Sequence, residues 1–149
     1  MRATIARRMQ ESVRDIPHFY TTISIDMSQA LSLRASFKKD ETLKPVSINH
    51  LILKAAAYAL GNEPRVNCAL KDNHVVNTGE INIGLVTSVE GGLLIPVIQN
   101  ADELPIRDLA LQARAAIDRA RAGKPSSQDL SGGTFTTVSY THLTLPTKA

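Results

Sequence analysis

The alternation of apolar and polar positions is clearest between residues 81 and 98. Apolar side chains recur there with the period of two that is typical of a strand with one buried face, at Ile81, Ile83, Leu85 and Val89. Gly91 and Gly92 follow this strand and predict a tight reversal, because glycine accepts positive φ values. Residues 93–98 are apolar on both faces, as in a strand buried from both sides. Pro96 cannot donate a ladder hydrogen bond, so we expect an edge or a bulge there. The region therefore predicts a β-hairpin.

Three longer segments show the spacing of amphipathic helices. The first covers residues 2–14, the second begins at Ser47 and stops at Gly61, and the third runs from Pro105 to Gly123, where glycine ends the helix. The expected apolar faces are Ile5, Met9 and Val13 in the first helix; Ile48, Leu51, Ile52, Ala55, Ala59 and Leu60 in the second; and Ile106, Leu109, Ala110, Ala113, Ile117 and Ala120 in the third.

Shorter elements fill the remaining chain. We expect a strand at 19–27, a helix at 29–39, strands at 66–70 and 74–77 around a turn, one helical turn at 126–129 and a strand at 132–136. Helices mixed with hairpin-linked strands predict an α/β (α+β) two-layer fold, not a doubly wound parallel sheet.

Composition narrows the class of protein further. The chain has 149 residues, 43% hydrophobic and 4% aromatic, so one domain with an aliphatic core is expected. A formal net charge of +3 is too small to indicate nucleic-acid binding by itself, and the sequence contains no apolar run of membrane-spanning length. The single cysteine, Cys68, excludes an intrachain disulfide. It is read as a small core residue, and the alternative of a nucleophile lacks an evident base nearby.

Several strings, in this order and spacing, resemble the catalytic domain of dihydrolipoamide acyltransferases, the E2 core components of 2-oxo acid dehydrogenase complexes. The matching strings are Arg2–Met9, Ile16–Tyr20, Lys54–Leu60, Pro64–Asn67, Gly92–Val97, Asn100–Asp102, Ala120–Lys124 and Gly132–Thr136. The resemblance implies a fold like chloramphenicol acetyltransferase, with a mixed sheet and helices on one face. It also implies a trimer that assembles into a larger hollow core.

The same resemblance implies the reaction and its partners. An acyl group would pass between a dihydrolipoyl group, carried on a separate domain of the parent protein, and coenzyme A as substrate. The E1 and E3 components would bind through domains outside this chain. The His18-Phe19-Tyr20 string is more similar to pyruvate- or branched-chain-type members than to the 2-oxoglutarate type, and acetyl is favoured over branched-chain or succinyl groups. A bacterial cytoplasm or a mitochondrial matrix is the expected location.

The family's general base is a histidine in a His-x-x-x-Asp-Gly motif, and the four histidines of this chain, at positions 18, 50, 74 and 142, are not followed by Asp-Gly at that spacing. We therefore expect residues 1–137 to be a partial, C-terminally truncated catalytic domain with little or no activity. Residues 138–149 match nothing in the family and are expected to be a non-native tail, the alternative being a short terminal strand. A second hypothesis makes the chain a non-catalytic trimeric assembly module.

Only substrate-binding and structural roles are therefore expected here, and no catalytic residue. The resemblance suggests that His18, Phe19 and Tyr20 border the acceptor channel; from the sequence alone His18 is a packed histidine at a strand entrance. His50 is expected to be solvated or capping. Arg2 matches the family arginine that pairs with the aspartate of the missing motif. Gly91, Gly92 and Pro96 are expected to be structural, since no phosphate-binding glycine motif is present. No metal, nucleic acid or membrane is expected.

Overall fold

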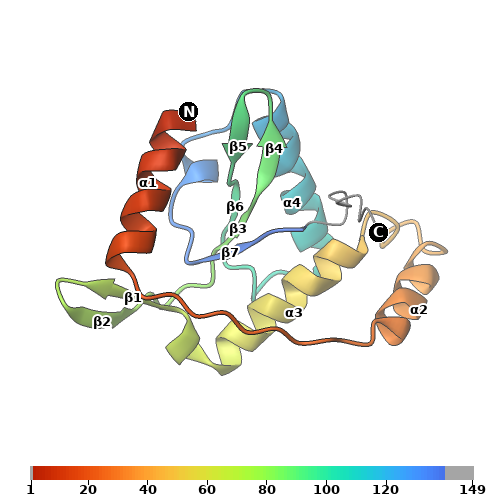
Figure 1. The fold of residues 1–149 in the computed structure, drawn as a ribbon. Coiled ribbons are helices and arrows are strands. Elements are labelled where there is room, and N and C mark those ends of the chain that lie inside the picture. Colours follow the sequence, from red (N-terminus) through yellow and green to blue (C-terminus); the bar gives the residue numbers. More distant parts are fainter. Residues whose placement is uncertain (1, 140–149) are drawn as a thin grey trace, which may run out of the picture.

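The computed structural model describes residues 2–139 and places four α-helices, two 3-10 turns and seven short strands there (Figure 1). The helical elements are α1 (Arg2–Asp15), α2 (Ser28–Phe37), α3 (Ile48–Asn62), η1 (Pro64–Val66), α4 (Ile106–Arg121) and η2 (Gln128–Leu130). The strands are β1 (Cys68–Lys71), β2 (His74–Asn77), β3 (Ile83–Leu85), β4 (Thr87–Val89), β5 (Gly92–Leu94), β6 (Val97–Ile98) and β7 (Phe135–Thr137). The helices predicted at 2–14, 29–39, from Ser47 to Gly61 and from Pro105 to Gly123 are confirmed within a few residues, and the strand expected at 66–70 begins later because η1 occupies residues 64–66.

A mixed three-stranded sheet, ordered β6-β3-β7, forms the centre of the molecule. Strand β3 pairs antiparallel with β6 and parallel with β7. The pairs β1-β2 and β4-β5 are separate antiparallel hairpins. The predicted α/β class with a mixed sheet is therefore confirmed, and β7 brings the end of the described chain beside its middle.

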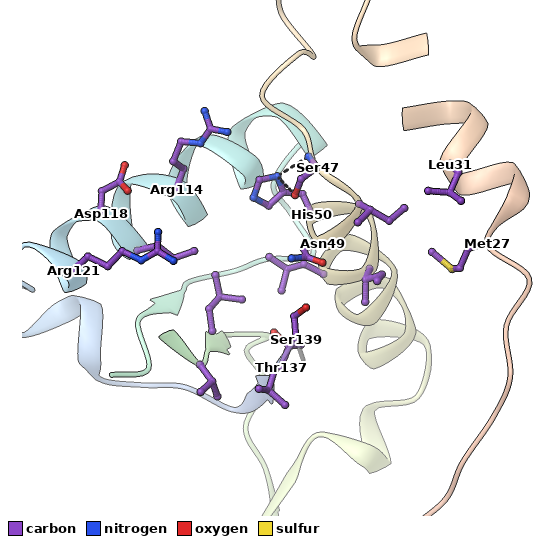
Figure 2. A pocket seen from close by; sticks show the side chains of 17 residues that line it. Met27, Leu31, Ser47, Asn49, His50, Arg114, Asp118, Arg121, Thr137 and Ser139 are labelled. Atoms are coloured by element: carbon purple, nitrogen blue, oxygen red, sulfur yellow. Dashed lines mark hydrogen bonds between the residues drawn. The ribbon is translucent and has the colours of Figure 1, made fainter. Parts of the chain in front are cut away.

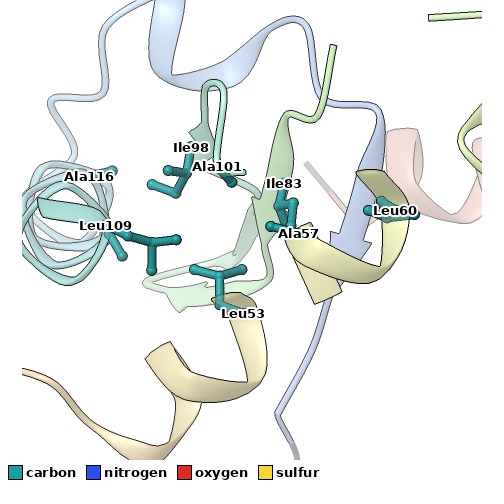
Figure 3. Close-up of a cluster of buried hydrophobic side chains, with 9 residues drawn as sticks. Leu53, Ala57, Leu60, Ile83, Ile98, Ala101, Leu109 and Ala116 are labelled. Carbon is teal, nitrogen blue, oxygen red and sulfur yellow. The ribbon is translucent and has the colours of Figure 1, made fainter. Parts of the chain in front are cut away.

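Helices α3 and α4 pack together on one face of this sheet, as expected. Ile83 and Ile98 lie directly opposite each other in the ladder and are almost fully buried. Figure 3 shows them facing side chains from both helices. The principal helical members of this core are Leu53, Ala57 and Leu60 of α3 and Leu109, Ala113 and Ala116 of α4. The many alanines let the two helices approach the sheet closely.

The face of α3 that is buried differs from the predicted one. Ile52, placed in the predicted stripe, is 49% exposed, whereas Leu53 is 2% exposed. Helix α3 is apolar on almost every side, so periodicity could not select a face, and packing against the sheet and α4 made the choice. The buried face of α4 agrees with prediction, because arginines and aspartates mark its outer side.

The central hairpin is divided into two parts. The predicted strand 81–89 is interrupted at Val86, so that β3 belongs to the mixed sheet and β4 to the outer hairpin. Pro96 separates β5 from β6 in the same way, and its carbonyl accepts the Leu85 N–H at 2.8 Å. Only Pro96–Ile98 is buried, since Leu93 and Ile95 are 46% and 43% exposed. Gly91 has φ +79° at the turn, whereas Gly92 is an ordinary strand residue.

The strand predicted at 19–27 is wrong for the described structure. Residues 17–27, here called the arm, form an extended segment without ladder partners and run from α1 to α2 across the outside of the molecule (Figure 1). Its apolar side chains are strongly exposed, with Phe19 at 87%, Tyr20 at 91% and Ile23 at 81%. A β-prone sequence becomes a strand only when a neighbouring strand is available, and residues 2–139 provide none beside the arm.

Asn82 joins the central strands to the loop before β7. Its side chain is 1% exposed, and its amide nitrogen donates to the Glu80 carboxylate at 2.8 Å and to the Gly132 carbonyl at 2.9 Å. Its side-chain oxygen accepts the Asn100 N–H at 2.9 Å. The Asn82 main-chain carbonyl also accepts the Thr134 N–H at 2.8 Å. One buried amide thus sets the register of segments about fifty residues apart.

Candidate functional site

A cavity of about 880 Å³ lies between α3, α4, α2 and the segment that follows β7 (Figure 2). Its walls are largely apolar, with Leu53 from α3, Leu85 from β3 and Ile117 from α4. Met27 and Leu31 approach from the side of α2, and Thr137 and Ser139 lie at the end of the described chain. The volume is of the size that encloses a small molecule or a substrate arm.

Helix α4 contributes a charged edge to this cavity. Arg114, Asp118 and Arg121 project from one side of the helix toward the opening (Figure 2). Within the described chain, neither arginine forms an ion pair. Guanidinium groups of this kind bind phosphate or carboxylate oxygens through paired hydrogen bonds. The arrangement suits an elongated ligand with an apolar section and anionic groups.

The first turn of α3 forms the opposite edge. Ser47 is the N-cap residue, and the Nδ1 atom of His50 accepts its backbone N–H at 3.0 Å. The Ser47 hydroxyl is 3.2 Å from the same nitrogen. Burial, followed by the positive charges of Arg114 and Arg34, lowers the pKa of His50. Of the two expectations for His50, solvated or capping, the structure shows the capping one, and its Nδ1 is already occupied by the helix cap.

The residues expected to border a substrate channel lie elsewhere. His18, Phe19 and Tyr20 are exposed on the arm and are not among the residues that line the cavity. The closest polar contact of His18 is Nε2 to the Ser12 hydroxyl at 3.5 Å. Their substrate-binding role stays a prediction. The side chain of Arg2, His142 and most of the expected tail 138–149 lie outside the described residues.

The cavity residues missed by sequence reasoning come from three distant segments. Arg114 and Arg121 are seven residues apart on α4 and therefore share a side of the helix, but the sequence pattern places them only on the outward side of that helix. The Ser47-x-x-His50 spacing was a usable signal, because position N3 commonly completes a helix cap. Neither pattern shows that α3 and α4 face each other across a cavity, because their relative position is set by packing on the same face of the sheet.

A metal site is not evident in the described chain: residues 2–139 contain no grouping of three His, Cys, Asp or Glu side chains able to hold an ion. The same residues include no helix with the length and apolarity to cross a bilayer.

The two-layer fold and the cavity beside its mixed sheet define an α/β domain with a cavity of ligand size. The sequence profile of the family 2-oxoacid dehydrogenases acyltransferase (catalytic domain) matches residues 1–143. The chain belongs to this family, and the predicted resemblance is confirmed.

Two curated relatives illustrate the match. The dihydrolipoyllysine-residue acetyltransferase component of the pyruvate dehydrogenase complex of Zymomonas mobilis is 35% identical over 136 residues, which cover 90% of this chain and 31% of the relative. The lipoamide acyltransferase component of the branched-chain alpha-keto acid dehydrogenase complex of Bacillus subtilis is 33% identical over 140 residues, covering 91% and 33%. The chain thus spans about a third of the length of these relatives.

Solved structures agree with the fold. The dihydrolipoamide acetyltransferase of Azotobacter vinelandii, studied for a serine, a histidine and an asparagine in its catalytic mechanism, superposes with a TM-score of 0.88 at 27% identity, covering 95% of this chain and 60% of that one. The cubic core of the pyruvate dehydrogenase multienzyme complex gives a TM-score of 0.87 at 27% identity with the same coverage. The fold expected from the resemblance is confirmed.

Proposed function

We propose that this chain is part of a catalytic domain that transfers an acyl group, with acetyl preferred, between dihydrolipoamide and coenzyme A. The observation that carries the proposal is the family match over residues 1–143. The cavity supports it, since an apolar channel with arginines at its edge suits a pantetheine arm followed by phosphates. The lipoyl group and the contacts to E1 and E3 would belong to other domains, in a bacterial cytoplasm or a mitochondrial matrix.

The chemistry requires a base that removes the proton of the attacking thiol and donors that stabilise the tetrahedral oxyanion. The family's His-x-x-x-Asp-Gly base is absent from the 149 residues. His18 lies on the exposed arm, and His50 uses Nδ1 in a helix cap. We therefore propose that the chain binds coenzyme A through the cavity and has no transferase activity by itself.

Two measurements test this pair of statements. Isothermal titration with coenzyme A is expected to show binding that weakens about tenfold or more in Arg114→Ala and Arg121→Ala, because each loss of a charged hydrogen bond costs about 1.5–3 kcal/mol. Arg107→Ala is the matched control: Arg107 lies on α4 outside the cavity, and its one ion pair among the described residues is with Asp108. Equal binding of coenzyme A by all variants would show that coenzyme A does not bind through the cavity.

Activity is measured as thioester formed on coenzyme A from S-acetyl-dihydrolipoamide, with isobutyryl and succinyl donors in parallel. The 149-residue chain is expected to stay at the uncatalysed rate. A fusion of the chain to a family segment that carries the histidine motif is expected to be active and to prefer acetyl. Turnover by the 149-residue chain would contradict the proposed inactivity, and preference for isobutyryl would replace acetyl by a branched-chain acyl group.

Self-assembly is the second proposed function, and the exposed arm favours it. Phe19, Tyr20, Ile23 and Ile25 are 68–91% exposed, although such side chains are normally covered. We propose that another copy of the chain covers them, in a trimer. Light scattering after gel filtration is expected to give three chains per particle, and Ile23→Ser with Ile25→Ser is expected to give monomers. Val75→Ser, on the exposed hairpin, is the control. A monomeric 149-residue chain without substitutions would refute this second function.

A further inference from the structure

The cap of α3 is a titratable device at the edge of the cavity. Most capping boxes place Glu or Gln at position N3, where the side chain accepts the N-cap N–H. Here an imidazole nitrogen performs this task, with Ser47 N–H donating to His50 Nδ1 at 3.0 Å. An imidazole can accept at Nδ1 only while that nitrogen carries no proton, which requires the neutral ring with its hydrogen on Nε2. The imidazole half of this capping box therefore exists in one protonation state of His50 only, whereas the other half, in which the Ser47 side chain accepts the His50 backbone N–H, does not depend on it.

The surroundings of His50 disfavour its charged form. Arg114 faces His50 from α4 and Arg34 faces it from α2, and the positive charges of both arginines disfavour a positive charge on the imidazole. The Nη1 atom of Arg34 is itself buried without a hydrogen-bond partner in the described chain. A cation in the first turn also opposes the positive end of the helix dipole. Asp118 and Arg121 of α4 line the same cavity, and among its described lining residues Asp118 alone carries a negative charge.

We propose that protonation of His50 releases the imidazole half of the N-terminal cap of α3 and reshapes the cavity edge, so that the cavity is assembled above the titration range of His50 and loosened below it. The residues affected belong to the cavity wall itself, because Ser47, Ile48, Asn49 and His50 all line it. The inference concerns the state of the cavity, and it stands whether or not coenzyme A is the ligand.

The direction of the pH dependence follows from the cause. Burial and the two arginines lower the pKa of His50 in the folded chain below the ordinary imidazole value. The folded chain therefore takes up this proton less readily than the unfolded chain. The stabilisation is complete above about pH 6.5, the ordinary pKa of histidine, and is lost as the pH falls through the folded-state pKa.

The test is an NMR titration of the 149-residue chain from pH 8 to pH 5. The neutral ring of His50 is expected as the Nε2–H tautomer, with a titration midpoint below 6.5, and the amides of Ser47 and Asn49 are expected to shift with that midpoint. Arg114→Gln is expected to raise the midpoint, whereas Arg107→Gln, on α4 outside the cavity, leaves it unchanged. An Nδ1–H tautomer, or a midpoint at or above the ordinary value, would overturn the inference.

A second measurement uses thermal unfolding. His50→Gln keeps an N3 acceptor that does not titrate, so the melting temperature of this variant is expected to fall less between pH 7.5 and pH 5.5 than that of the parent chain. His74→Gln removes a histidine from the exposed strand β2 and is expected to follow the parent chain. Parallel pH curves for His50→Gln and the parent chain would refute the proposed cap release.

Discussion

Replacing Asn82 by alanine tests how the central strands are held together. The substitution removes three side-chain hydrogen bonds, to Glu80, Gly132 and Asn100, from a side chain that is 1% exposed. Gly132 and Asn100 are themselves exposed residues, so water can partly replace the lost partners. Each bond is then worth about 1 kcal/mol, near the centre of measured values. The expected loss in the free energy of unfolding is about 2–4 kcal/mol, a large share of a typical total of roughly 5–15 kcal/mol.

The assay is urea unfolding followed by circular dichroism, with the midpoint and slope fitted separately. Hydrogen exchange of the Thr134 and Phe135 amides, which both donate to the Asn82 carbonyl, is expected to accelerate with the destabilisation. Asn62→Ala is the matched control, because Asn62 is exposed and its amide only bonds to Tyr58 one turn earlier; its effect should stay within about 0.5 kcal/mol.

The aspartate variant sharpens the test. Asn82→Asp keeps an acceptor for the Asn100 N–H but loses both N–H donors and places a carboxylate beside Glu80. It is expected to be at least as destabilising as alanine at pH 7. A loss of less than about 1 kcal/mol for Asn82→Ala, within the usual worth of a single hydrogen bond, would show that the amide does not organise the sheet.

Three further changes have expected outcomes. Arg119 donates to both oxygens of the buried Asp129 carboxylate and holds its pKa well below the ordinary value, so Asp129→Asn is expected to cost about 2–3 kcal/mol at pH 7. In urea unfolding this gap is expected to narrow as the pH falls below about 4, because the carboxylate of the unfolded chain then takes up a proton while the carboxylate of the folded chain stays ionised. A Cβ on Gly84 would lie 2.7 Å from Cγ2 of Ile95, so Gly84→Ala is expected to lower the urea midpoint by the equivalent of about 1–3 kcal/mol. Adding Ile95→Ala to this variant is expected to recover part of the loss, and the absence of any recovery would refute the clash. Lys54 donates to the carbonyls of residues 101, 102 and 104 at 3.4, 2.7 and 2.7 Å and so anchors the loop that leads into α4. Lys54→Met is therefore expected to speed hydrogen exchange in the first turn of α4. Unchanged exchange would contradict the anchoring role.

The sequence alone determined the elements whose pattern has one physical solution. Charged residues on one side of 106–121 left only one face of α4 to bury, and the pair Gly91-Gly92 predicted the turn in which Gly91 has φ +79°. The family strings identified the fold, because their order and spacing reflect a whole domain. These features depend on local chemistry and can be read along the chain.

The tertiary structure decided everything that depends on a partner distant in sequence. Helix α3 is apolar nearly all round, and only packing against Ile83 and Leu109 buried Leu53 in place of Ile52. The arm has a strand-forming sequence but no neighbouring strand among the described residues. The cavity joins the start of α3, the outer side of α4 and the segment after β7, so no local pattern could reveal it. Periodicity reports what a segment can bury, whereas the neighbours that cover it are set by the fold.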